Sequence, residues 1–146
     1  VGFLCRERRN ARGQREAFDL VTLDGSASAT LADENGPDQR RKVSKYFVQV
    51  DQLESFSFPI LDQALNTTRS TPFAFVFDEI GTMELVSDGF VDRVRRLLTS
   101  PDPNLHVLGT VAMKGRGFVN AAKQLPGVDV VEVTQPDRDA KAEEVT

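Results

Sequence analysis

The stretch that decides the fold reads Phe73-Ala74-Phe75-Val76-Phe77-Asp78-Glu79-Ile80-Gly81-Thr82-Met83-Glu84-Leu85. Its first five residues form a continuous apolar run, which is typical of a strand buried on both faces in a parallel sheet. Because an unpaired buried charge is very costly, we expect this strand to end at Phe77, before the two carboxylates. The carboxyl end of such a strand opens into the crevice where α/β sheets bind ligands.

Two carboxylates at the tip of a buried strand resemble the Walker B element of a P-loop NTPase. In that interpretation Asp78 holds Mg²⁺, usually through water, and Glu79 polarises the water that attacks the γ-phosphate. The alternative is an ordinary Asp-Glu turn after a core strand, which is a common arrangement.

Composition limits the other classes of function. The chain has 146 residues, of which 40% are hydrophobic and 27% charged, as expected for one globular domain. Its net charge of −4 argues against a dedicated nucleic-acid surface. The single cysteine, Cys5, excludes an internal disulfide. No apolar run approaches the roughly 20 residues of a membrane span and no secretory signal is present, so we expect a cytoplasmic protein without a membrane partner.

Around the central strand, short strands are predicted to alternate with helices. Strands are expected at Val1–Leu4, Glu16–Leu23, Lys45–Val50, Leu105–Ala112 and Val128–Val133. Helices are expected at 51–56, 58–65, Ser87–Leu98 and Gly115–Leu125. Asp51 and Glu54 match a capping box, and Pro59 divides the first helical region because it lacks an N–H.

This order predicts one α/β domain over residues 1–146, with a mainly parallel sheet flanked by helices. We expect an antiparallel edge hairpin at 1–25, a loop at 26–44, the α/β core at 45–139 and a fraying tail at 140–146.

Several segments together resemble one family. They are Gly2-Phe3, Phe18–Gly25, Lys45–Val48, Pro59–Leu61, Asp78–Leu85, Leu108–Thr110, and Val133-Thr134 with Arg138-Asp139. In order and spacing they resemble the cancer-related, or thermophilic-type, nucleoside-triphosphatases, and Asp-Glu-Ile-Gly-x-Met-Glu-Leu is the most specific part. The resemblance implies a RecA-like P-loop fold. It also implies slow, Mg²⁺-dependent hydrolysis of ATP, GTP and other nucleoside triphosphates to diphosphate and phosphate.

The sequence also departs from that family. In the family a strand and a Gly-rich P-loop precede the segment that begins here at Val1, and nothing in the chain fits Gly-x-x-x-x-Gly-Lys-Ser/Thr. The nearest stretch, Gly109–Gly117, lacks the Gly-Lys-Ser/Thr ending, and Thr82 stands where the family favours Lys. We therefore expect the P-loop upstream of Val1. Because catalysis of this kind depends on holding the phosphates, we expect the chain alone to be inactive and weakly stable.

Further site residues are expected to have more local roles. Thr110 is a candidate sensor of the γ-phosphate, or a strand-end hydroxyl bonded to backbone. Lys114 and Arg116 are candidate transition-state cations, or simply exposed loop residues. Arg138 either stacks on the nucleotide base or pairs with Asp137 or Asp139. Glu84 is expected to be structural, and the only histidine, His106, to be a surface or packing residue.

Three functions follow in order of preference. The first is an NTP hydrolase whose P-loop lies upstream. The second is a non-catalytic nucleotide-binding or interaction module of the same fold. The third is a metal-dependent phosphoesterase that uses the carboxylates of Asp78, Glu79 and Glu84 without a P-loop.

Overall fold

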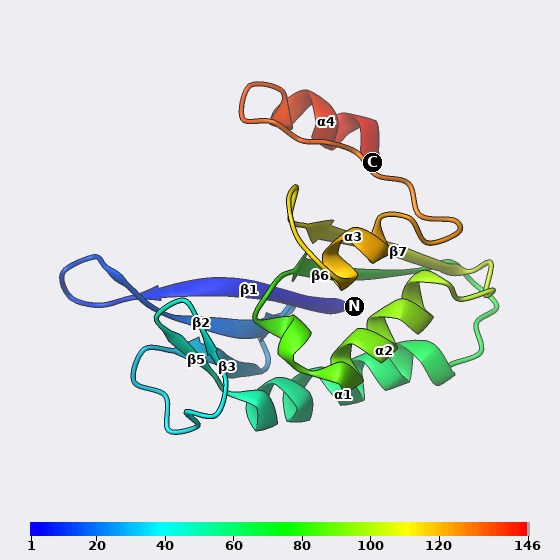
Figure 1. Cartoon of the computed structure of the whole chain (residues 1–146). Coiled ribbons are helices and arrows are strands. Elements are labelled where there is room, and N and C mark those ends of the chain that lie inside the picture. Colours follow the sequence, from blue (N-terminus) through cyan, green and yellow to red (C-terminus); the bar gives the residue numbers. More distant parts are fainter. Residues whose placement is uncertain (146) are drawn as a thin grey trace.

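Residues 1–145 are described by a computed structural model, in which seven strands form one mixed sheet with helices against it (Figure 1). The strands are β1 (Gly2–Arg9), β2 (Arg15–Thr22), β3 (Ser28–Asp33), β4 (Lys42–Val43), β5 (Tyr46–Val48), β6 (Phe73–Ile80) and β7 (Leu105–Val111). The helices are α1 (Val50–Asn66), the short 3₁₀ helix η1 (Glu84–Val86), α2 (Asp88–Leu98), α3 (Phe118–Ala122) and α4 (Arg138–Val145). The predicted α/β architecture is thus confirmed. The prediction of a mainly parallel sheet is wrong, because within residues 1–145 two strand pairs are parallel and four are antiparallel.

The sheet has the strand order β4-β5-β3-β2-β1-β6-β7. The pairs from β4 to β1 are antiparallel, whereas β1–β6 and β6–β7 are parallel. The predicted hairpin exists as β1 and β2, but its predicted place at the sheet edge is wrong, because β1 also pairs with β6. Close approach at this seam requires Gly2: its φ is +143°, and an added Cβ would lie 1.6 Å from the carbonyl oxygen of Val76.

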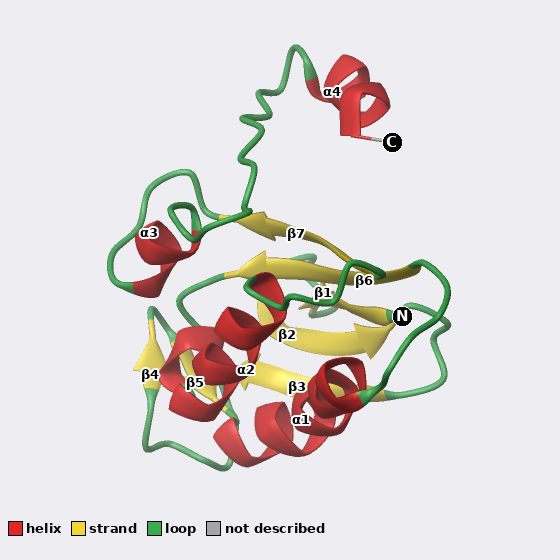
Figure 2. Ribbon diagram, turned by 90° about the vertical axis from the view of Figure 1, so that its right-hand side faces the viewer, coloured by secondary structure: helices red, strands yellow, loops and turns green. Residues whose placement is uncertain are grey.

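Helices α1 and α2 lie side by side against one face of the sheet (Figure 1, Figure 2). Phe3 of β1 joins them to the central strands, because its ring lies 5.9 Å from that of Phe56, 6.2 Å from Phe75 and 6.4 Å from Phe90. Edge-to-face aromatic packing of this kind adds to the stabilisation from buried apolar area. The core beneath β6 is therefore rigid, and β6 is held on both sides by parallel neighbours.

Helix α1 is continuous, so the prediction of two helices divided at Pro59 is wrong. Pro59 lies on the exposed side of the helix. The backbone carbonyl that loses its partner there faces water, which lowers the cost of a proline inside a helix. The buried side is a line of residues at helical spacing, Leu53, Ser57, Leu61 and Ala64.

The predicted capping box of α1 does not form either. The helix begins at Val50, one residue early, and Gln49 at its N-cap makes no side-chain capping bond. The Glu54 carboxylate instead accepts a hydrogen bond of 2.8 Å from the hydroxyl of Ser87. Ser87 also caps α2 as predicted, because its Oγ accepts the backbone N–H of Phe90 at 3.1 Å.

The predicted loop at 26–44 contains β3 and β4. The small residues of β3 give no clear apolar–polar alternation in the sequence, and the strand forms through long-range pairing with β2 and β5. The opposite error occurs at Val128–Val133, which is not a strand because it pairs with no strand among the described residues. The predicted helix at Gly115–Leu125 shortens to α3, and α4 forms where a fraying tail was expected.

No helix within residues 1–145 is both long enough and apolar enough to cross a membrane.

Candidate active site at the end of β6

Asp78 and Glu79 form a bulge near the carboxyl end of β6. Phe77 pairs with Gly109 and Ile80 pairs with Val111. Asp78 and Glu79 of β6 therefore lie opposite a single residue of β7, Thr110. Glu79 has φ +61°, the left-handed region in which a residue with a side chain is strained. The expectation that the strand stops before the carboxylates is therefore wrong: the strand continues to Ile80, and the bulge turns the carboxylates outward. Bulges recur beside active sites for this reason.

The hydroxyl of Thr110 holds the two bulged residues together. Its Oγ1 accepts the backbone N–H of Glu79 at 2.9 Å and donates to Oδ1 of Asp78 at 3.1 Å. One side chain therefore fixes the strained backbone of Glu79 and the orientation of the Asp78 carboxylate. The structure agrees with the predicted strand-end hydroxyl bonded to backbone, with a carboxylate as its second partner.

Glu84 places a third carboxyl behind this pair. It lies in η1, only 3% exposed, and its Oε2 would be 3.0 Å from a Cβ added to Gly81. The pKa of Glu84 is raised to about 7, mainly by burial and also by the nearby charges of Glu79 and Asp78, while hydrogen bonding to the backbone of Glu84 and Gly81 opposes the shift. The expectation of a structural role for Glu84 agrees with this burial.

Glu84 should make folding stability depend on pH. The pKa is 4.5 for the exposed carboxyl and about 7 in the folded chain, so the folded state binds more protons between these values. Proton binding by Glu84 stabilises the folded state by about 3 kcal/mol below pH 4.5, and this stabilisation is lost as pH rises through about 7. The free energy of unfolding of Glu84→Gln, measured in urea and compared with wild type, should therefore rise by up to that amount between pH 4.5 and pH 8.

A Glu84→Gln protein with the wild-type pH dependence of its unfolding free energy would contradict a buried, proton-binding Glu84.

Cys5 on β1 also faces the carboxylates. Burial raises the pKa of its thiol to about 12, together with the charges of Glu84, Asp78 and Glu79. The thiol therefore stays protonated at neutral pH. Nothing in the sequence pattern indicated this neighbourhood, because it depends on β1 lying beside β6.

The other candidate residues lie elsewhere. Lys114 and Arg116 are exposed in the loop after β7, and among the described residues neither makes an ion pair with the site carboxylates. Arg138 belongs to α4, which stands apart from the sheet in both views (Figure 1, Figure 2). Its Nε lies 3.6 Å from Oδ1 of Asp139, one of the two expected pairs. The structure therefore unites Asp78, Glu79 and Thr110 but not the three cations.

A groove of about 1090 Å³ runs along β7 to the bulge. β7 is the last strand of the sheet on this side, and Leu108 on it is 51% exposed. The opposite wall is the extended segment that includes the exposed Val130, Val131 and Val133. An open strand edge lined by apolar side chains favours association with a further strand.

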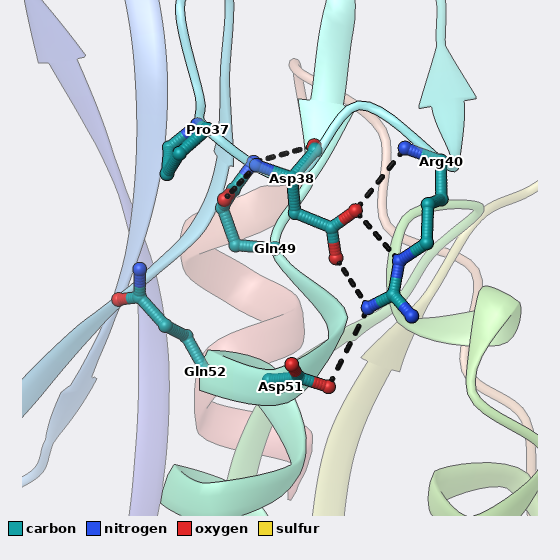
Figure 3. A pocket seen from close by; sticks show the side chains of 6 residues that line it. All are labelled: Pro37, Asp38, Arg40, Gln49, Asp51 and Gln52. Carbon is teal, nitrogen blue, oxygen red and sulfur yellow. Dashed lines mark hydrogen bonds and ion pairs between the residues drawn. The ribbon is translucent and has the colours of Figure 1, made fainter.

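A second, smaller pocket lies at the start of α1 (Figure 3). The amide of Gln49 there bonds to the backbone N–H and C=O of Asp38, both at 3.1 Å. Arg40 pairs with the carboxylates of Asp38 and Asp51. Because these polar groups are satisfied by one another, we interpret the pocket as structural.

Within the residues whose side chains are described, no group of three or more His, Cys, Asp or Glu side chains is arranged to hold a metal ion. The carboxylates of Asp78, Glu79 and Glu84 are accordingly not such a group.

The profile of the family described as NTPase matches residues 1–146, the whole chain. The chain belongs to the NTPase family. The prediction of this family from the Asp-Glu-Ile-Gly-x-Met-Glu-Leu segment is thus confirmed.

Named relatives of the family share about a third of the residues. The chain is 29% identical to nucleoside-triphosphatase THEP1 of Aquifex aeolicus, covering 99% of this chain and 81% of the relative. It is 33% identical to the human cancer-related nucleoside-triphosphatase, covering 94% of this chain and 74% of the relative.

Solved structures of these relatives confirm the predicted fold class. The crystal structure of the Aquifex aeolicus THEP1 superposes with a TM-score of 0.82 at 28% identity, over 100% of this chain and 81% of that one. The solution structure of a human cancer-related nucleoside triphosphatase gives 0.75 at 32% identity, over 99% and 78%. The sheet therefore has the α/β arrangement of P-loop NTPases.

Proposed function

We propose that this family member hydrolyses nucleoside triphosphates, ATP and GTP among them, to diphosphate and phosphate at the end of β6. The observation that carries the proposal is the bulge, in which Thr110 holds Asp78 and Glu79 in one fixed arrangement. Phosphoryl transfer depends on positioning and electrostatic stabilisation, so two oriented carboxylates suit it. The names of the relatives support the same activity.

Glu79 has the role of orienting and polarising the attacking water. Its side chain is exposed, whereas its backbone is held by the 2.9 Å bond to Thr110. Its Cγ and Cδ would both lie 3.2 Å from a Cβ added to Gly81, so a glycine there leaves room for the side chain. An exposed carboxylate on a fixed backbone is suited to accept a proton from water.

Asp78 has the role of holding Mg²⁺ through water. Mg²⁺ keeps several waters and is bound by one or two carboxylates. Oδ1 of the half-buried Asp78 accepts the Thr110 hydroxyl, and Oδ2 accepts no hydrogen bond from residues 1–145. The donor set therefore fits the ion. Bound Mg²⁺ would neutralise the phosphate charge that develops during transfer.

The phosphate cradle is proposed to come from a segment upstream of Val1. The groove along the open edge of β7 has the apolar lining that an added parallel strand requires, and it leads to the bulge. A Gly-rich loop after such a strand would meet the carboxylates, as the β7 and β6 carboxyl ends are neighbours. The proposal requires Gly-x-x-x-x-Gly-Lys-Ser/Thr within about 40 residues before Val1 in the gene. A gene without this motif would contradict it.

Thr110, Lys114, Arg116 and Arg138 are proposed to contribute in smaller ways. Thr110 reaches the γ-phosphate only indirectly, through the two carboxylates that it holds. Lys114 and Arg116 are exposed on the loop that follows β7, from which a cation can turn toward transferring phosphate. Arg138 would have to leave Asp139 to stack on the base.

The test is Mg²⁺-dependent phosphate release from ATP and GTP by the full-length protein. Asp78→Asn should raise the Mg²⁺ concentration needed for half-maximal activity at least tenfold, since an amide binds the ion poorly. Asp92→Asn on the exposed face of α2 is the control and should behave as wild type. A wild-type protein that binds nucleotide without releasing phosphate would favour the alternative, a non-catalytic binding module.

A further inference from the structure

Gly81 lies between two acidic side chains with different surroundings. Measured from a Cβ added at Gly81, the Glu79 side chain lies at 3.2 Å and Oε2 of Glu84 at 3.0 Å. Glu79 is exposed, whereas Glu84 is 3% exposed and faces the protein interior. The turn at Gly81 thus contacts the proposed catalytic carboxylate on one side and a buried carboxyl on the other.

The Glu84 carboxyl lies against this turn. Its Oε2 is 3.0 Å from the position of a Cβ added at Gly81, and hydrogen bonding to the backbone of Glu84 and Gly81 lowers its pKa against the larger effect of burial. The turn is closed where the N–H of Leu85 donates to the carbonyl of Gly81 at 3.3 Å. The N–H of Ser87, the cap of α2, donates to the carbonyl of Glu84 at 3.2 Å. Glu84 therefore connects the end of β6 to the start of α2.

This connection matters because Glu79 has a strained backbone. Left-handed φ in a residue with a Cβ persists only where the surroundings impose it. Thr110 restrains the N–H of Glu79 from the side of β7, but the residues after Glu79 need their own restraint. The buried Glu84 carboxyl, packed against Gly81, is placed to supply it.

We propose that Glu84 is a positioning residue, whose buried carboxyl fixes the Gly81 turn and thereby aims Glu79 at the reacting phosphate. This inference rests on the proposed function. The role requires side-chain length rather than charge: the polar end of the Glu84 side chain must reach Gly81. Because burial raises the pKa of Glu84 to about 7, the carboxyl is partly neutral in the working range, and an amide is a close substitute.

Two conservative variants separate reach from charge in the full-length protein. Glu84→Gln keeps the length and loses the charge, so it should retain kcat within about threefold. Glu84→Asp keeps the charge but is one methylene shorter, so kcat should fall at least tenfold while KM changes less than threefold. The same two proteins are examined by NMR scalar couplings that report φ of Glu79. The positive φ should persist in Glu84→Gln and be lost or averaged in Glu84→Asp.

Equal kcat and equal φ of Glu79 in the two variants would overturn the inference. A kcat of Glu84→Gln as low as that of Glu84→Asp would also overturn it, because the loss would then not depend on side-chain length alone. The φ measurement does not need turnover. If wild-type protein releases no phosphate, the proposed function fails, while a positive φ that follows side-chain length still supports the positioning of Glu79 by Glu84.

Discussion

Glu79→Gln is expected to lower kcat for nucleoside triphosphate hydrolysis by about 10²–10⁴-fold, the usual contribution of a positioned base. Glutamine retains the shape of the side chain, and the backbone N–H of residue 79 still donates to Thr110. It loses the ability to accept a proton from the attacking water. Nucleotide affinity should stay within about threefold, because Glu79 is assigned to the water and not to the phosphates.

Single-turnover phosphate release measures the chemical step, and fluorescent nucleotide titration measures the affinity. Glu34→Gln is the matched control, since Glu34 follows β3, which β2 and β1 separate from β6. A Glu79→Gln protein that hydrolyses at the wild-type rate would show that another group activates the water.

Gly2→Ala is expected to lower the free energy of unfolding by about 3 kcal/mol or more. The added Cβ would lie 1.6 Å from the carbonyl oxygen of Val76, a backbone atom that cannot turn aside. The substitution also places a side chain at φ +143°. The clash falls on the only seam between the antiparallel and parallel parts of the sheet, the Gly2–Val76 and Phe3–Phe77 pairs of β1 and β6.

Gly13→Ala is the control for this effect. Gly13 has φ +74°, and a Cβ added there meets nothing within 4 Å, so only the backbone cost of about 1 kcal/mol remains. Urea unfolding followed by circular dichroism compares the two. Equal losses would mean that β1 and β6 separate easily and that the clash at Val76 has little energetic weight.

The sequence was most informative where local pattern and burial agree. The apolar run before Asp78 predicted β6, and the spacing of Phe90, Val94 and Leu97 predicted α2 with its Ser87 cap. The specific Asp-Glu-Ile-Gly-x-Met-Glu-Leu segment identified the family, which periodicity alone could not do. In each case one short stretch carries the information.

The sequence was least informative where contacts between distant residues decide. Nothing near Glu79 predicts its positive φ, because the bulge depends on Thr110 of the next strand. The sequence likewise does not indicate that Cys5 of β1 lies near enough to Glu84 for the carboxylate charge to raise the pKa of the thiol. At Pro59 the local rule failed, because packing of the opposite face of α1 outweighs one missing hydrogen bond.

The central claim is that nucleotide and metal bind at the β6 bulge. The most direct measurement uses Mn²⁺ with a non-hydrolysable nucleoside triphosphate on the full-length protein, and records which backbone amide NMR signals the paramagnetic ion broadens. We predict that the signals of Glu79, Ile80 and Thr110 disappear while those of Arg40 and Gln49, in the pocket at the start of α1, remain. Broadening at Arg40 and Gln49 with intact signals at the bulge would contradict the account.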